Sequence, residues 1–492
     1  MKKQVVLIMV DTQSADMLQL YNPDGVPCPN ISRIAEGGAL FENGYTVSPV
    51  CGPARSALFT GQYPSTNGVW SNGLSLGQDT LNAAQRLAPA GVPCAYIGKW
   101  HLDGGDYFGK GVCAPGFDPG YWYDMRNFVD ELPNNEARRL SRKNMGAMVK
   151  GDVQEEDTYA HRVTERALRY IREHKDEDFF LVVSYDEPHD PSQCPKKYVQ
   201  ELKKSGFRIK NRPNTNAALK GKPAIQKLWR DAFPIPWPLL KMGFAKGFFP
   251  CNSFVDHEIG RVLDAVDTLA DPLVIYTADH GDMQNAHGLM AKCAAMYEEI
   301  THVPFLVKGG PFQNRRIKTP VSHIDLLPTI MEFFGLNKPR MLEGESLYAI
   351  RDDEKRDVHM QFGRFEAEVD GYLGFMPIRS IFDGRYKLNI NLLSTDELYD
   401  LEKDPYELRN LIDRAPYRKI RDALHDRLLA HMDETVDPFR GYPWACRPWR
   451  KGKKPSFQNS GCTRQRCEEG TVRYDYATGC PVESEIRFKG MK

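Results

Sequence analysis

The sequence has no long apolar run and no excess of charge of either sign. Its 492 residues carry 65 lysines and arginines and 65 aspartates and glutamates, so the formal net charge is zero. A chain without net charge has no long-range field that attracts nucleic acid or an anionic membrane surface. No apolar stretch approaches the roughly 20 residues that a membrane-spanning helix needs. We therefore expect neither a nucleic acid nor a membrane as partner.

The sequence also lacks a convincing secretion signal and a disulfide framework. Its N-terminus, MKKQVVLIMVD, starts with basic residues, but the apolar run is only about six residues long and Asp11 ends it. Eleven cysteines, an odd number spread over a large chain, are not typical of a disulfide-stapled domain. We expect a reducing, cytoplasmic location and interpret the apolar run as a first β-strand.

Short apolar runs alternate with helical stretches along most of the chain. The runs lie at 5–10, 92–97, 179–184, 273–277 and 305–307, and the clearest helix at 158–174. This alternation predicts an α/β fold with a large, mostly parallel sheet sandwiched by helices. Beyond about residue 370, the segments 379–390 and 396–405 indicate hairpin strands, and 417–432 an amphipathic helix. We expect a main domain over 1–370 and a smaller α+β subdomain over 371–492, with a small antiparallel sheet, a helix and an extended tail.

The stretch SPVCGPARSALFTG, residues 48–61, contains a C-x-P-x-R motif. Pro53 suits the first turn of a helix, which Gly61 ends, so Cys51 lies at or just before a helix N-terminus. Free backbone N–H groups there favour negative charge. The motif alone is also compatible with a small buried cysteine.

Polar side chains follow the predicted strands, where ligands bind in open α/β sheets. Taken singly, each is also typical of a cap or a turn. Taken together, they suit an anionic tetrahedral group that is held by a metal and lysines while a nucleophile attacks it. They comprise ligands for a divalent cation (Asp11, Asp279, His280), cations for an oxyanion (Arg55, Lys99, Lys292) and imidazoles for proton transfer (His101, His189).

Sulfate and phosphate esters fit this set of residues. A thiolate, however, is a poor ligand for a hard cation among carboxylates. Either the metal is softer, such as Zn²⁺, or Cys51 is converted to an oxygen nucleophile.

Several motifs in the expected order resemble the formylglycine-dependent (type I) sulfatases of the alkaline-phosphatase superfamily. The motifs are C-x-P-x-R followed by SALFTG, GKWHL (98–102), EPHDP (187–191), TADHG (277–281) with Lys292, MYEEITHVP (296–304), SHIDLLPTI (322–330) and ELYDLEKDPYELRNL (397–411). The resemblance covers most of the chain. It implies that 1–370 is a catalytic sulfatase domain of alkaline-phosphatase-like fold.

The resemblance further implies that a formylglycine-generating maturation enzyme oxidises Cys51. The hydrated aldehyde attacks sulfur, displaces the alcohol and then releases sulfate. Arg55 holds the hydrated group, and Lys99 and Lys292 neutralise the sulfate oxygens. His189 donates a proton to the leaving oxygen, and His101 is the base in sulfate release. A divalent ion, Ca²⁺ before Mg²⁺ or Mn²⁺, is held by the set Asp11, Thr12, Cys51, Asp279 and His280.

Two positions depart from the family pattern. Thr12 stands where many relatives have a second aspartate, so its oxygen or that of Gln13 is the expected replacement ligand. Asp279-His280 stands where many relatives have Asp-Asn, and phosphonate-monoester and phosphodiester hydrolases of the same superfamily also show Asp-His. Hydrolysis of such phosphoesters is therefore an alternative function.

The substrate is expected to be a sulfated small molecule or saccharide. Trp70, Asn72, Asp103 and Arg364 are candidate substrate contacts by position, with Asp106 and Glu366 as further candidates. The segment 203–246, with eleven lysines and arginines and one acid, indicates an irregular insertion: either a solvated loop or a cationic lid. A homo-oligomer is a possible assembly.

A non-enzyme alternative rests on the basic run RPWRKGKK, 447–454, which could bind nucleic acid in a salt-dependent way. Cys462, Cys467 and Cys480 follow it at spacings that fit a zinc knuckle poorly.

Overall fold

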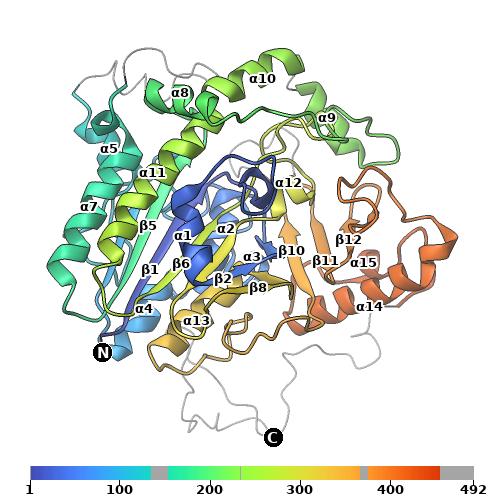
Figure 1. Ribbon diagram of the computed structural model, residues 1–492. Coiled ribbons are helices and arrows are strands. Elements are labelled where there is room, and N and C mark those ends of the chain that lie inside the picture. The colour runs from blue at the N-terminus through green and yellow to red at the C-terminus, as the bar shows by residue number, and fades with distance from the viewer. Residues whose placement is uncertain (1, 134–152, 233, 366–374, 455–492) are drawn as a thin grey trace, which may run out of the picture.

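The computed structural model describes residues 2–133, 153–232, 234–365 and 375–454 (Figure 1). Its main sheet has seven strands in the order β4-β5-β1-β6-β7-β2-β8. β4, β5, β1 and β6 run parallel, whereas β7 is antiparallel to both of its neighbours. The strands are β1 Gln4–Asp11, β2 Ala39–Phe41, β4 Cys94–Gly98, β5 Phe179–Pro188, β6 Leu273–Ala278, β7 Phe305–Lys308 and β8 Arg315–Ile317; a separate pair joins β3 Gly44–Tyr45 and β9 Val321–Ser322.

Helices cover both faces of this sheet, because alternate residues of the central strands are apolar on both sides. In β1, Val6 and Ile8 contribute to one core and Val5 and Leu7 to the other. The helices are α1 Pro29–Gly37, α2 Cys51–Thr60, α3 Pro64–Asn67, α4 Ala83–Leu87, α5 Met125–Glu131, α7 Tyr159–His174, α8 Lys196–Lys204, α9 Ala224–Ala232, α10 Trp237–Lys246, α11 Phe248–Val266, α12 Glu298–Thr301 and α13 Leu326–Phe333. The predicted α/β fold with a mostly parallel sheet is confirmed.

A second, antiparallel sheet follows in the order β10-β11-β12-β13, and α14 packs on it. Its elements are β10 Val358–Phe362, β11 Ile378–Phe382, β12 Tyr386–Asn391 and β13 Glu397–Asp400, with α14 Arg418–Glu434 and α15 Tyr442–Ala445. The predicted C-terminal sheet and helix are present. The sheet begins at β10, before the domain boundary that the sequence predicts at residue 370. That boundary and the predicted extended tail, from residue 455 onward, lie outside the described residues.

None of the helices in the described part of the chain combines the length and apolarity needed to cross a membrane. Eight cysteines lie in that part and all are free thiols. Cys462, Cys467 and Cys480 fall outside it.

Candidate active site

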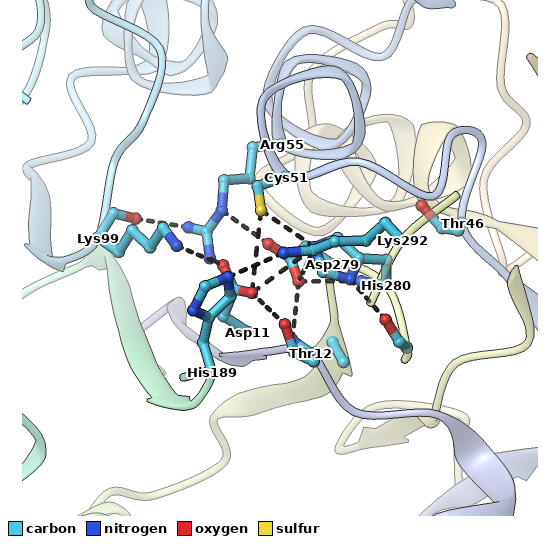
Figure 2. A network of polar contacts seen from close by, with 12 residues as sticks. Asp11, Thr12, Thr46, Cys51, Arg55, Lys99, His189, Asp279, His280 and Lys292 are labelled. Carbon is cyan, nitrogen blue, oxygen red and sulfur yellow. Dashed lines mark hydrogen bonds and ion pairs between the residues drawn. The ribbon is translucent and has the colours of Figure 1, made fainter. Parts of the chain in front are cut away.

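Cys51 is the first residue of α2 and lies at the carboxyl edge of the parallel strands (Figure 2). Pro53 occupies the first turn, and Gly61, with φ of 65°, ends the helix as predicted. The Cys51 side chain is 1% exposed, and its Sγ lies 3.1 Å from His280 Nε2. Burial and Asp11 raise the pKa of the thiol, but Lys292, His280 and Lys99 outweigh them and hold it well below its usual value. The position therefore favours an anionic group.

Arg55 joins two buried carboxylates beneath Cys51. Its Nε donates to Asp279 Oδ2 over 2.9 Å, and its Nη2 lies 3.2 Å from Asp11 Oδ2. Its Nη1 donates to the Lys99 carbonyl and to Ser184 Oγ, so all three guanidinium nitrogens are engaged. Because the side chain is fully buried and paired, Arg55 fixes the two carboxylates relative to the nucleophile position.

Asp11, Cys51, Asp279 and His280 form a buried cluster whose candidate ligand atoms all lie within 4.8 Å of one another. The His280 Nδ1–H donates to the Gly281 carbonyl over 2.9 Å, which directs Nε2 at the cluster. Burial lowers the pKa of His280, but Asp279 and Cys51 outweigh it and raise the pKa, so a cation that binds to Nε2 displaces a proton from it. Burial and Asp11 raise the pKa of Asp279 to about 6, while His280 and Arg55 act in the opposite direction. Two close carboxylates and an oriented imidazole fit a divalent cation.

Thr12, and not Gln13, faces this cluster. The Thr12 hydroxyl donates to Asp11 Oδ1 over 2.7 Å, and its backbone N–H donates to Asp279 Oδ1 over 3.2 Å. Gln13 instead donates from Nε2 to Asn252 and accepts from the Tyr276 hydroxyl. Since the Gln13 side chain is committed elsewhere, Thr12 is the better placed of the two candidate ligands.

Lys99 follows β4 and reaches Asp11 Oδ2 at 2.8 Å and Asp186 Oδ1 at 2.9 Å. Burial lowers the pKa of Lys99, but the two carboxylates outweigh it and the net shift is upward. Tyr107, which no sequence motif marked, covers the ammonium with its ring at 4.2 Å. Its hydroxyl accepts from Lys99 over 3.1 Å and donates to Asp186 over 2.7 Å. Tyr107 and Asp186 thus complete the surroundings of the lysine.

His189 lies between Tyr107 and Lys292. Its Nδ1 is 2.9 Å from the Tyr107 hydroxyl and 2.8 Å from the Asp190 carbonyl, and its Nε2 is 2.8 Å from Lys292 Nζ. Burial and Lys292 lower the pKa of His189, but Asp190 and Asp11 reverse this and raise it to about 9. Two protonated groups would repel at 2.8 Å, so in this contact Lys292 is the ammonium that donates to the unprotonated Nε2 of His189. The raised pKa of His189 favours its protonation once the contact opens.

His101 lies at the rim of this network with φ of 59°. Its ring meets Tyr107 edge-on, with centroids 5.7 Å apart. Within the described part of the chain, its buried Nδ1 has no hydrogen-bond partner. Such a nitrogen is available to a group that binds beside Tyr107.

The candidate substrate residues have mixed surroundings. Asn72 Oδ1 accepts from the Gly52 N–H over 2.8 Å and so supports the start of α2. Asp103 accepts from the backbone N–H groups of Gly105 and Lys110 and holds its own loop. Trp70 and Arg364 form a cation–π pair at 5.7 Å. Of the two further candidates, Asp106 pairs with Arg126, and Glu366 lies outside the described residues.

The segment 203–246 is not irregular throughout, as it contains α9 and α10. Pro238 lies in the first turn of α10, where proline starts a helix instead of breaking it. Several of its cations are paired with the scaffold: Lys210 with Asp24, Arg212 with Asp16 and Lys222 with the Glu407 carbonyl. A cationic lid is therefore poorly supported.

Three of the five cations of the basic run 447–454 are paired with acids of the fold. Arg447 pairs with Asp396 at 2.8 Å, and both Arg450 and Lys453 pair with Asp426. These pairs hold the run against the C-terminal subdomain and offset part of its charge.

Known proteins resemble this chain over most of its length. The model of the Sulfatase family matches residues 3–336, and that of the N-sulphoglucosamine sulphohydrolase C-terminal region matches 285–434. An Escherichia coli K12 protein described as the uncharacterized sulfatase YidJ is 40% identical over 486 residues, which cover 97% of each chain.

Two solved structures show the same fold. BT4656, in complex with its substrate D-glucosamine-2-N,6-O-disulfate, has a TM-score of 0.72 and 18% identity, covering 89% of this chain and 99% of its own. The phosphonate monoester hydrolase of Agrobacterium radiobacter has a TM-score of 0.71 and 21% identity, and the match covers 87% of this chain and 95% of the hydrolase.

Proposed function

Because the chain belongs to the sulfatase family, we propose that it releases inorganic sulfate from a sulfated sugar through a formylglycine made from Cys51. The chain is a sulfatase and thus an enzyme. The observation that carries the finer proposal is a gathering of side chains from helix α2 and from three separate loops around one buried site (Figure 2). The side chains are Cys51 and Arg55 of α2, and Lys99, His189 and Lys292 of the loops. Oxidation of Cys51 by a maturation enzyme replaces a soft thiolate with an oxygen nucleophile that suits a hard cation.

In this proposal Asp11, Thr12, Asp279 and His280, together with residue 51, hold a divalent cation, Ca²⁺ before Mg²⁺ or Mn²⁺. When bound, the cation acts as a Lewis acid that stabilises negative charge on the sulfate. The support is the donor set itself, which offers carboxylate oxygens and an imidazole lone pair fixed by Gly281.

The cationic side chains bind the sulfate group. Lys99 and Lys292 approach it from two sides and offset its charge, and Arg55 keeps Asp11 and Asp279 in place. Loss of one such electrostatic donor typically costs about 3–4 kcal/mol of barrier.

His189 and His101 move protons in this proposal. Entry of the ester separates His189 Nε2 from Lys292, which stays an ammonium. His189 then takes up a proton from solvent, as its raised pKa favours, and donates it to the leaving alcohol oxygen. The Tyr107 hydroxyl and the Asp190 carbonyl keep the proton on Nδ1, so that Nε2 is the atom that faces the substrate. His101, with its unsatisfied Nδ1, serves as base in sulfate release.

The test is a screen of the matured protein on sulfated monosaccharides and on phenylphosphonate monoesters, with Cys51→Ala as control. The mass of the Cys51 peptide reports conversion of the thiol to the aldehyde. Sulfate release from sugars, absent in Cys51→Ala, supports the proposal. Turnover of phosphonates alone supports the alternative that Asp279-His280 and the similarity to a phosphonate monoester hydrolase keep open.

A further inference from the structure

Helix α10 carries apolar side chains that the fold leaves unburied. Its sequence is WPLLKMGFAK, and none of its ten residues is buried. Leu239 is 55% exposed and Met242 is 49% exposed. Exposing large apolar side chains to water costs free energy, so a cluster of them on a surface marks a place where something binds.

One side of α10 forms the wall of a cavity of about 300 Å³ beside the candidate active site. The α10 wall consists of Leu239, Leu240, Met242 and Phe244. Across the cavity lie Lys292, the Thr12 of the cation cluster, and Asp190, the neighbour of His189. The cavity is therefore continuous with the site assigned to the sulfate, and its volume suits a small organic group.

The charges around the cavity restrict its occupant. Asp190 and Asp282 place carboxylates in its lining, and Lys246 and Lys292 add cations. Because Lys292 is assigned to the sulfate, Lys246 alone remains to offset the two carboxylates, which disfavours a second anion at this place. The apolar wall offers no hydrogen bonds to further sugar hydroxyls, whereas it suits an alkyl or aryl substituent carried by the sulfated sugar.

We propose that this cavity binds an apolar alkyl or aryl portion of the alcohol whose sulfate ester is hydrolysed at Lys292. The inference rests on the proposed function, because the position of the sulfate orients the alcohol. It adds that the substrate is amphipathic: its sulfate lies among lysines and its organic part lies against α10.

The experiment measures binding of n-alkyl sulfonates, from methanesulfonate to hexanesulfonate, to the full chain in Ca²⁺ by calorimetry. Sulfonates lack the scissile oxygen, so binding is read without turnover. We expect the affinity to rise about three- to fourfold per added methylene, as burial of a CH₂ group predicts. In the double variant Leu239→Ser/Met242→Ser, the gain in affinity per added methylene is expected to fall below about twofold. Both side chains are half exposed, so the double variant is expected to fold.

Leu228→Ser is the matched control. Leu228 is 58% exposed on the neighbouring α9 and does not line the cavity. This variant keeps the wild-type dependence on chain length. An affinity that does not depend on chain length, or a dependence that the double variant retains, overturns the inference.

Two further measurements test the covering of α10 and the proposed function separately. Sedimentation of wild type and the double variant tests whether a second copy of the chain covers α10. If the wild type is an oligomer that the double variant dissociates, while the affinity for alkyl sulfonates keeps its dependence on chain length, the inference is overturned. Turnover of the sulfated monosaccharides tests the proposed function independently. Chain-length-dependent binding without sulfate release leaves the cavity assignment standing and contradicts the proposed function.

Discussion

Lys292 Nζ lies 2.8 Å from His189 Nε2, so these two groups of the site contact one another directly. In the proposed function, a sulfate ester that enters between them replaces this contact with two new ones: the lysine contacts a sulfate oxygen and the imidazole contacts the bridging oxygen. The proposal thus couples binding of the anion to protonation of His189 Nε2.

Lys292→Met is expected to lower kcat by about 10²–10³-fold, since it removes one cationic donor from the developing charge. Steady-state kinetics on the best sulfated substrate from the screen measure the loss. Lys241→Met, which removes a cation from the side of α10 away from the site, is the control and keeps full activity. Equal losses in both variants would contradict the role of Lys292.

Tyr107→Phe is expected to lower kcat by about five- to tenfold with little change in KM. The hydroxyl's hydrogen bonds to His189, Lys99 and Asp186 are lost, while the ring still covers Lys99. The pH–rate profile is the second readout, because a change in the surroundings of His189 shifts the pH at which the rate responds to protonation of this histidine. Tyr121→Phe removes a hydroxyl that bonds to Glu173 at the surface and serves as control. An unchanged kcat and profile in Tyr107→Phe would show that the hydroxyl does not position the histidine.

Thr12→Val is expected to raise the Kd of the divalent cation by about tenfold, since the isosteric side chain lacks the oxygen that faces the cluster. Calorimetric titration of the metal-free protein with Ca²⁺ measures this change. Gln13→Met alters the contacts to Asn252 and Tyr276 and is expected to lower the melting temperature while leaving the Kd unchanged. The reverse pattern would make Gln13 the ligand.

His425 is expected to make the protein more sensitive to acid. It is buried, donates from Nε2 to the Trp444 carbonyl, and burial lowers its pKa to about 4. Below the unfolded pKa of about 6.5, the unfolded chain takes up a proton that the folded chain does not, so stability falls as the pH falls toward 4.

The measurement compares wild type with His425→Gln, because groups common to both proteins cancel. Between pH 6.5 and 5.5 the stability advantage of wild type is expected to shrink by about 1 kcal/mol, as measured by urea unfolding. A difference that is constant with pH would mean that His425 titrates normally in the folded protein.

The fold could be predicted where the sequence carries long apolar signals. The central strands of the main sheet are continuous runs of buried apolar residues, and α7 has a strong apolar stripe that begins after Thr158. The short strands β2 and β8, three residues each, carry no such signal, because their pairing partners are set by distant segments. Likewise β10 pairs with β11 across the predicted domain boundary.

The site was predictable where a motif marks it. The structure places three motif residues, Cys51, Lys99 and Lys292, in one site. Tyr107 belongs to no sequence pattern, and the loop after His101 brings it into contact with Lys99. The choice between Thr12 and Gln13 depends on Asn252 and Tyr276, which come from α11 and β6. Only the packed fold brings those partners together.

The burial of Cys51 bears on when the nucleophile can be made. With 1% of its surface accessible and the first turn of α2 around it, the side chain is beyond the reach of any second protein once folding is complete. Under the proposed function, a modifying enzyme therefore meets this segment while the chain is still open. The share of competent molecules is then decided during biosynthesis, and supplying the modifying enzyme to folded protein afterwards is not expected to raise it.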